Sequence, residues 1–160
     1  LERLANSGRI RKGDTLLDYG CGKGRVDCYL SYQTRCHSIG VEYDPRIYET
    51  AAENQKTAVS GGRTEFVLAD AGEFPVPGAV NRAYFFNPFS VELLQKVIRR
   101  ILDSWYEVSR EIRLFFYYPS DEYLAYLMTV DELVFADEID CRELFDGNDA
   151  RERIVEFVLE

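Results

Sequence analysis

The sequence is short of the residues that build metal sites. It contains one histidine, His37, and four cysteines, Cys21, Cys28, Cys36 and Cys141, and no two cysteines stand in a CxxC spacing. Structural zinc sites use four such ligands at short, regular spacings. We therefore expect no metal site, and we interpret the cysteines as reduced thiols of a cytoplasmic protein.

Basic residues and long apolar runs are scarce as well. The chain has 19 lysines and arginines against 28 acidic residues, so its formal net charge is −9. No basic cluster is long enough to follow a phosphate backbone, and stable binding of nucleic acid is therefore disfavoured. There is no signal peptide and no run of roughly 20 apolar residues, so we expect no membrane partner.

The chain is too short for two domains of ordinary size. Its 160 residues suit one compact domain, which buries roughly two thirds of the surface of its unfolded chain. No repeat, low-complexity tract or linker divides it, so we expect residues 1–160 to form a single domain. Leu1, Leu4 and Ile10 resemble the apolar side of a helix already under way, and we expect residues upstream of this sequence to be missing.

Short apolar runs alternate with helical patterns over most of the chain. The apolar runs predict five strands, at residues 15–19, 38–43, 65–69, 83–86 and 112–118. A mixed run after Arg25 predicts a first helix, Asp44 and Pro45 open a second, and Ser90 opens a third. The third helix has the clearest apolar face, formed by Leu94, Val97, Ile98, Ile101, Leu102 and Trp105. Such alternation predicts a parallel sheet with helices on both faces.

The last 40 residues break this alternation. A short helix is predicted at 121–128, followed by strand-like stretches at 132–145 and 151–158. Between them, the sequence Asp146-Gly147-Asn148 is a hairpin signal. The predicted fold class is therefore α/β, a three-layer sandwich whose seven-stranded sheet is mostly parallel and ends in an antiparallel C-terminal hairpin.

The stretch LLDYGCGKGR runs from the first predicted strand into a glycine turn. Gly20, Gly22 and Gly24 allow backbone N–H groups and the positive end of a helix to approach a ligand without an intervening Cβ. A Walker loop requires Gly-Lys-Ser/Thr, but Lys23 is followed by Gly24 and Arg25, which argues against a nucleoside triphosphate. The dinucleotide fingerprint GxGxxG requires glycine where Arg25 stands, which weakens NAD without excluding it.

The second predicted strand carries an acidic residue near its end. Glu42 follows Gly22 by twenty residues, and a carboxylate at the tip of the neighbouring strand can accept hydrogen bonds from both hydroxyls of a ribose. Together, the glycine turn and Glu42 predict a nucleoside ligand.

At this point the sequence resembles the class I S-adenosylmethionine-dependent methyltransferases, which have a Rossmann-like fold. Their first motif is an acidic residue followed by GxGxG, here DYGCGKG at 18–24. GVEYDP at 40–45 is similar to the ribose motif of the family, LADAGEFP at 68–75 to its adenine motif, and FFNPFS at 85–90 to its fourth motif. The four motifs occur in the family's order within a little under half of the chain.

The resemblance implies S-adenosylmethionine as the cofactor. The cofactor-binding residues that it implies are Asp18, Tyr19, Gly20, Cys21, Gly22, Gly24, Glu42, Tyr43, Asp70, Ala71 and Asn87. The backbone at 20–24 would pass beside the methionine part and the ribose. Asp18 would fix the loop or meet the ammonium group through water, and Glu42 would hold the ribose. Tyr43 would flank the adenine, Asp70 would accept from its exocyclic amine, and the Ala71 N–H would meet a ring nitrogen. A cofactor with a sulfonium and an ammonium suits these carboxylates.

The fourth motif is similar to the Asn/Asp-Pro-Pro-Tyr/Phe of methyltransferases that act on the amines of adenine or glutamine. The resemblance implies catalytic roles for Asn87, Pro88 and Phe89: the Asn side chain and the Pro carbonyl accept from the amine, and the ring stacks on its planar group. The second proline is absent here, and a simple turn capped by Ser90 is the alternative. Tyr117 and Tyr118 are candidates for the border of the substrate pocket.

The predicted function is methyl transfer by direct displacement to an acceptor, with a small molecule or a protein preferred over nucleic acid. An amine is one candidate acceptor group. A noncatalytic adenosyl-binding or protein-interaction module with the same fold remains the alternative, and NAD binding is third. The connection at 71–80 is too short for the helix that the family usually has there, and we expect thin cover and a groove on that side of the sheet.

Overall fold

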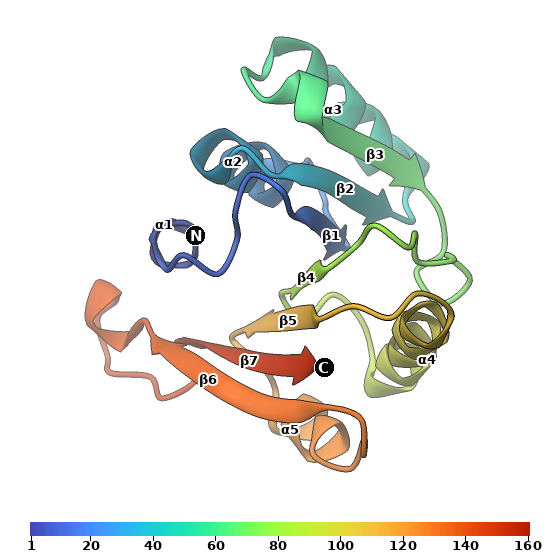
Figure 1. Ribbon diagram of the computed structural model, residues 1–160. Coiled ribbons are helices and arrows are strands. Elements are labelled where there is room, and N and C mark those ends of the chain that lie inside the picture. Colours follow the sequence, from blue (N-terminus) through green and yellow to red (C-terminus); the bar gives the residue numbers. More distant parts are fainter.

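A computed structural model describes residues 1–160 of the protein. Its seven strands form one sheet in the order β3-β2-β1-β4-β5-β7-β6 (Figure 1). The strands are β1 (Thr15–Tyr19), β2 (His37–Glu42), β3 (Thr64–Leu68), β4 (Arg82–Phe85), β5 (Ile112–Tyr117), β6 (Val134–Asp140) and β7 (Arg153–Leu159). The first five are parallel, and β7 runs antiparallel to both β5 and β6. The predicted mostly parallel sheet with an antiparallel end is confirmed.

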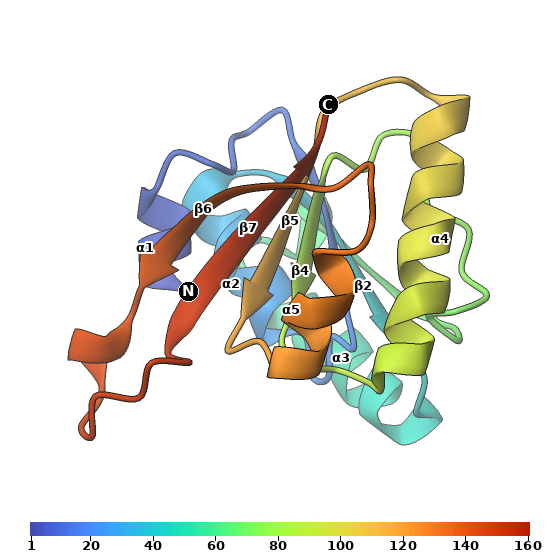
Figure 2. The ribbon, with the colours of Figure 1, turned by 90° about the horizontal axis from the view of Figure 1, so that it is seen from below.

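Helices cover both faces of the sheet (Figures 1 and 2). They are α1 (Glu2–Asn6), α2 (Arg25–Thr34), α3 (Pro45–Thr57), α4 (Val91–Glu107) and α5 (Asp121–Leu127), and two short 3-10 helices occupy Gly61–Arg63 and Arg142–Leu144. Figure 2 shows α4 and α5 on one side of the sheet and α1 and α2 on the other. No helix is both long and apolar enough to cross a bilayer.

The alternation of side chains along each strand feeds two separate cores. Leu17 and Phe85 belong to the larger core beneath α4 and α5, whereas their neighbours Leu16 and Tyr84 belong to a smaller core beneath α1 and α2. This follows from the period of two along a strand, which sends successive side chains to opposite faces. Consequently, the last two residues of a strand point to opposite faces of the sheet.

The predicted helix starts are confirmed. Asp44 accepts hydrogen bonds from the N–H groups of Arg46 and Ile47, and Pro45 occupies the first position of α3. Ser90 accepts from the Leu93 N–H at the start of α4. Side-chain caps of this kind satisfy N–H groups that have no partner within the helix. Of the predicted apolar face of α4, Leu102 and Trp105 are only half-buried, and four residues are buried: Leu94, Val97, Ile98 and Ile101.

Two boundaries differ from the predictions. The first helix ends at Asn6, and Ile10 reaches the core from the following turn, where Gly8 has a φ of 77°. The stretch 146–148 does not form a tight hairpin, because β6 ends at Asp140 and β7 begins only at Arg153, with twelve residues between them. The residues from 142 to 151 are exposed, and strand pairing there would bury no apolar face.

The connection between β3 and β4 contains no helix, as expected, but it is fastened to α4. Arg100 donates to the Gly72 carbonyl at 3.1 Å and pairs with Glu73 at 3.2 Å. Val76 of the same connection is buried in the larger core. Instead of leaving that face thinly covered, the connection takes the place of a helix, and a cavity of about 1180 Å3 lies on the α1 and α2 face.

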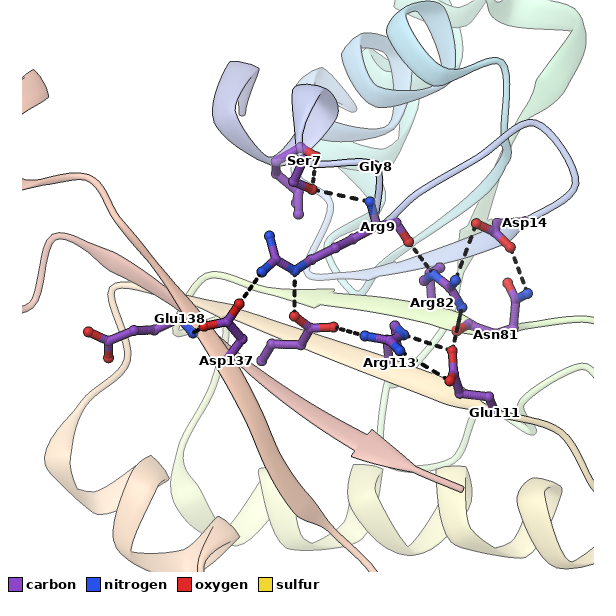
Figure 3. A network of polar contacts seen from close by, with 12 residues as sticks. Ser7, Gly8, Arg9, Asp14, Asn81, Arg82, Glu111, Arg113, Asp137 and Glu138 are labelled. Carbon is purple, nitrogen blue, oxygen red and sulfur yellow. Dashed lines mark hydrogen bonds and ion pairs between the residues drawn. The ribbon is translucent and has the colours of Figure 1, made fainter.

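A network of ion pairs joins β4, β5, β6 and β7 to the segment that follows α1 (Figure 3). Glu156 of β7 is 2% exposed and pairs with Arg9 and Arg113, each at 2.6 Å. Arg82 at the start of β4 lies 3.5 Å from Asp14. The buried carboxylates of this network are thus neutralised by arginines.

Candidate active site

The loop from β1 to α2 requires glycine for two reasons. Gly20, Gly22 and Gly24 all have positive φ values, of 68°, 56° and 85°, which other residues adopt at a cost. In addition, a Cβ on Gly24 would lie 2.3 Å from the Phe66 ring, and one on Gly20 would lie 2.7 Å from the Pro88 Cβ. A Cβ on Gly22 would meet nothing within 4 Å, so at this point the loop faces open space.

Glu42 is bonded directly to this loop. Its Oε1 accepts from the Gly22 N–H at 3.0 Å, and its Oε2 accepts from the Asp44 N–H at 2.9 Å. The contact arises because β1 and β2 are parallel neighbours, with Tyr19 opposite Val41. The carboxylate is half-buried, and each oxygen keeps a lone pair for a further donor.

The residues of the predicted adenine motif lie at the same edge. Tyr43 follows Glu42 and is 75% exposed. Asp70 is exposed just beyond β3, where its Oδ1 accepts from the Gly72 N–H at 2.9 Å. Ala71 turns its methyl group into the larger core. Ligands of open α/β sheets bind at the carboxyl ends of the strands, and the end of β1, the end of β2 and the turn after β3 meet there.

Two residues of the first motif point away from the loop surface. Tyr19 is 1% exposed, its ring stacks on Phe85 with centroids 5.0 Å apart, and its hydroxyl has no partner. Cys21 packs against Ala51 and Phe66, and burial raises the pKa of its thiol. Both residues therefore offer only their backbone to a ligand.

A buried pair of carboxyl groups lies beneath the loop. Asp18 at the end of β1 is 3% exposed, and Asp27 in the first turn of α2 is fully buried. Burial raises the pKa of Asp18 to about 7, and burial together with the neighbouring Asp18 raises the pKa of Asp27 well above its usual value. The sequence analysis missed Asp27. The available signal was helical spacing: Asp27 stands three and four residues before Leu30 and Ser31, with which it shares the buried face of α2.

The turn after β4 is held by the side chain of Asn87. Its Nδ2 donates to the Tyr118 carbonyl at 2.5 Å, and its Oδ1 accepts from the Ser120 N–H at 3.3 Å. Asn87 has a φ of 39° and Tyr118 a φ of 50°. The amide therefore joins the carboxyl ends of β4 and β5, and its oxygen retains one lone pair for another donor.

Pro88 and Phe89 lie between this turn and the glycine loop. Pro88 packs on Gly20. The half-buried ring of Phe89 makes edge contacts with Tyr19 and Phe85, with centroids 6.3 and 6.4 Å away. The predicted catalytic residues are thus next to the predicted cofactor loop, and the Phe89 ring already has partners in the core.

An exposed aromatic residue at the same turn escaped the sequence analysis. Phe86 is 57% exposed, and its ring lies 4.9 Å from that of Tyr117, centroid to centroid. Both rings line the cavity of about 1180 Å3 on the α1 and α2 face, where Arg25 is also exposed. The walls of the cavity also include Tyr29, Tyr84, Ile139, Phe145 and Ile154. Phe86 directly precedes Asn87, so the cavity begins beside the turn that Asn87 holds.

Solved structures of methyltransferases share this fold. An RNA methyltransferase from Salinibacter ruber, in complex with S-adenosylhomocysteine, superposes with a TM-score of 0.66 at 19% identity, covering 99% of this chain and 87% of that one. A TehB-like S-adenosylmethionine-dependent methyltransferase from Corynebacterium glutamicum has a TM-score of 0.70 at 17% identity, covering 99% and 85%. These likenesses confirm the predicted Rossmann-like architecture.

Sequence comparison identifies the family. The 27-O-demethylrifamycin SV methyltransferase of Amycolatopsis mediterranei (strain S699) is 27% identical over 113 residues, which are 71% of this chain. The match spans 39% of the length of that enzyme. A family model described as a methyltransferase domain matches residues 16–111, more than half of the chain. The protein therefore belongs to this methyltransferase-domain family, and its resemblance to the class I S-adenosylmethionine-dependent enzymes is confirmed.

Proposed function

We propose that the protein is an S-adenosylmethionine-dependent methyltransferase. The observation that carries this proposal is the Glu42 carboxylate at the end of β2, bonded to the Gly22 N–H beside an open loop, in a chain of the methyltransferase-domain family. That carboxylate has the position and the free lone pairs to accept from ribose hydroxyls.

The remaining cofactor contacts follow along the same edge. The backbone of Tyr19, Gly20, Cys21 and Gly24 passes beside the methionine part, and Asp18 lies below it. Tyr43 flanks the adenine, for which its exposed ring supplies an apolar surface. The adenine amine donates to Asp70, and its ring nitrogens accept from Ala71 and its neighbours. Asn87, next to Pro88 and Gly20, borders the transferred methyl group.

Methyl transfer requires mainly that the protein positions the acceptor relative to the methyl group. A methyl group leaves a sulfonium by direct displacement, so the protein must hold the acceptor lone pair in line with the methyl carbon and the sulfur. Asn87, with its free lone pair, and the Pro88 carbonyl serve an amine acceptor in this way, and Phe89 closes the site from the core side. Where the acceptor carries a proton, that proton leaves to solvent or to a nearby base.

The acceptor that the cavity favours is a small molecule with an apolar or aromatic body. Phe86 and Tyr117 place two aromatic rings beside the Asn87 turn, and the cavity continues between α1, α2 and β6. Aromatic walls bind flat apolar groups well. The relative from Amycolatopsis acts, by its name, on a small molecule. The net charge of −9 makes the RNA acceptor of the Salinibacter enzyme a poorer model for this chain.

A noncatalytic adenosyl-binding or protein-interaction module is the second candidate. The observation in its favour is that the Asn87 amide and the Phe89 ring are both engaged by the fold itself. Transfer to a found acceptor that is unaffected by Asn87→Ala assigns Asn87 to structure. Cofactor binding without any transfer across an acceptor screen favours the module.

We also propose a cytoplasmic location and a single domain over residues 1–160. All four cysteines are free thiols: Cys21, Cys36 and Cys141 are buried, and Cys28 is half-buried. Reducing compartments keep thiols in this state. The two apolar cores share one continuous sheet, which supports cooperative unfolding as one unit.

Calorimetric titration tests the cofactor assignment. The protein is titrated with S-adenosylmethionine and S-adenosylhomocysteine, with NADH as the competing candidate. We expect both adenosyl ligands to bind and Glu42→Ala to weaken them roughly 10- to 100-fold, the effect of losing two hydrogen bonds that each contribute about 1 kcal/mol net at a partly solvated carboxylate. Glu49→Ala, an exposed change on the neighbouring helix α3, is the matched control. Selective NADH binding, or no loss in Glu42→Ala, contradicts the proposal.

A further inference from the structure

Asp18 of β1 and Asp27 of α2 form a buried pair of carboxyl groups next to Gly40 of β2. Asp18 lies opposite Gly40 in the parallel register of β1 and β2. A Cβ on Gly40 would lie 2.9 Å from Asp27 Oδ2 and 2.8 Å from Cys21 Cβ. The absence of a side chain at Gly40 thus leaves the space into which the Asp27 carboxyl group fits, and, besides burial, the neighbouring Asp18 carboxyl group contributes to the raised pKa of Asp27.

No basic group balances this pair. Asp18 Oδ2 and both carboxyl oxygens of Asp27 are buried without a hydrogen-bond partner, and neither residue takes part in an ion pair. The apolar Phe66 of β3 lies beside the same Gly40 position, where a Cβ would be 2.7 Å from its ring. The other ionisable groups that act on the pair are themselves acids: Cys21, Cys28, Glu42 and Tyr84.

One proton bound to the pair removes the repulsion between the two carboxylates. Two ionised carboxylates side by side in a dry site repel each other and lose their hydration, so one of them stays protonated. The protonated group then donates a hydrogen bond to the other, which gives partners to oxygens that otherwise have none. The first turn of α2 favours one negative charge at Asp27, so the pair keeps a single charge rather than none.

We propose that Asp27 is a positioning residue of the cofactor site, which shares one proton with Asp18 in the free protein and loses it when the ammonium group of the ligand approaches Asp18. The inference rests on the proposed cofactor. The proton passes to solvent, and the pair changes from one negative charge to two as the ligand brings one positive charge. Asp27 thereby supplies charge to the site only when a cation is present.

The sign of the pH dependence follows. Because the bound state holds fewer protons, binding tightens as the pH rises, by at most about tenfold per pH unit for one proton, and levels off above the titration of the pair. The only histidine, His37, lies exposed at the opposite end of β2. S-adenosylhomocysteine carries the ammonium group and 5′-methylthioadenosine lacks it, so only the first ligand releases the proton.

Calorimetry in buffers of different ionisation enthalpy measures this proton. At pH 6 to 8 we expect S-adenosylhomocysteine to release a proton fraction that decreases as the pH rises, and methylthioadenosine to release none. Asp27→Asn replaces the protonated group by an amide that still donates to Asp18; it binds S-adenosylhomocysteine without proton release and with an affinity independent of pH. Asp103→Asn, an exposed change on α4, behaves like the unmodified protein.

Infrared difference spectroscopy of the unmodified protein keeps the test independent of the variant. S-adenosylhomocysteine should remove the C=O band of a protonated carboxyl group, and methylthioadenosine should leave it. Failure of S-adenosylhomocysteine to bind at all overturns the proposed cofactor. Binding with no proton release, no band loss and a flat pH profile overturns the role of Asp27 alone and leaves the cofactor assignment standing.

Discussion

Two regions of the same sheet treat acidic side chains in opposite ways. In the ion-pair network, Glu156 of β7 is buried between Arg9 and Arg113, and Asp14 lies beside Arg82 (Figure 3). At the carboxyl end, no basic side chain pairs with any of four carboxyl groups, those of Asp18, Asp27, Glu42 and Asp70.

We interpret the paired charges as contributors to stability and the unpaired carboxyl groups as candidates for ligand binding. The paired charges fasten the segment after α1 to β4, β5 and β7, and removal of one partner leaves a buried charge without compensation. Among the unpaired carboxyl groups, Glu42 and Asp70 accept hydrogen bonds from backbone N–H groups, whereas Asp18 and Asp27 cost free energy through their burial. The cofactor site proposed above, for a ligand with two positive charges, accounts for that cost.

The largest expected effect is in the ion-pair network. Glu156→Gln leaves Arg9 and Arg113 without their shared carboxylate, and we expect the free energy of unfolding to fall by about 2 to 3 kcal/mol, because both arginines are partly solvated. Urea unfolding measures this. Glu143→Gln, which loses only a surface pair with Arg3, should change it by less than about 0.5 kcal/mol. Equal effects of the two variants would remove the distinction between buried and surface pairs.

The aromatic residues on either side of Asn87 provide the next contrast. Phe89 is half-buried against Tyr19 and Phe85, so Phe89→Ala should lower the free energy of unfolding by about 2 kcal/mol. Phe86 is exposed, so Phe86→Ala should change it by less than about 0.5 kcal/mol.

Phe86→Ala, which should barely change stability, should change the kinetics of methyl transfer once an acceptor is found. Phe86→Ala should raise the KM for an apolar acceptor several-fold while S-adenosylhomocysteine binding, measured by calorimetry, stays unchanged. An unchanged KM for such an acceptor would place the acceptor outside the cavity.

The pH dependence of stability distinguishes the two regions without a ligand. Burial raises the pKa of Asp18 to about 7, so between about pH 5.5 and 7 the folded protein holds a proton that the unfolded chain has released. The free energy of unfolding should therefore fall as the pH rises in this window, by at most about 1.4 kcal/mol per pH unit. Urea unfolding at a series of pH values should show this slope, and Asp27→Asn should flatten it. A stability that rises with pH in this window would contradict the shared proton.

The smallest effect is expected at the adenine end. Asp70→Ala removes one hydrogen bond to the exocyclic amine and should weaken S-adenosylhomocysteine about fivefold, equivalent to about 1 kcal/mol. Calorimetry compares it with Glu65→Ala, an exposed change on β3. A loss as large as that of Glu42→Ala would mean that the adenine, and not the ribose, dominates recognition.

Most of the fold was predictable because its signals are local. The strand limits agree within one residue for the five parallel strands, and Asp44 and Ser90 cap their helices as expected. The glycine loop and Glu42 were found for the same reason, since a fixed spacing joins them and the parallel pairing of β1 and β2 brings them together.

The missed features depend on contacts that no local pattern contains. Burial of Asp27 requires α2 to pack over Gly40 of a different strand. Phe86 and Phe89 are alike in sequence, yet Phe86 is exposed and Phe89 packs against Tyr19 and Phe85. The loop from 141 to 152 carries a hairpin signal, but the exposed Leu144 and Phe145 have no sheet face to bury against.

The most direct test of the account is a crystal structure of the protein with S-adenosylhomocysteine. We predict the ribose hydroxyls within hydrogen-bonding distance of Glu42, the adenine between Tyr43 and Asp70, and the ammonium group above Asp18. A ligand bound elsewhere, or one whose ribose makes no contact with Glu42, would contradict the assignment of the unpaired carboxyl end as the cofactor site.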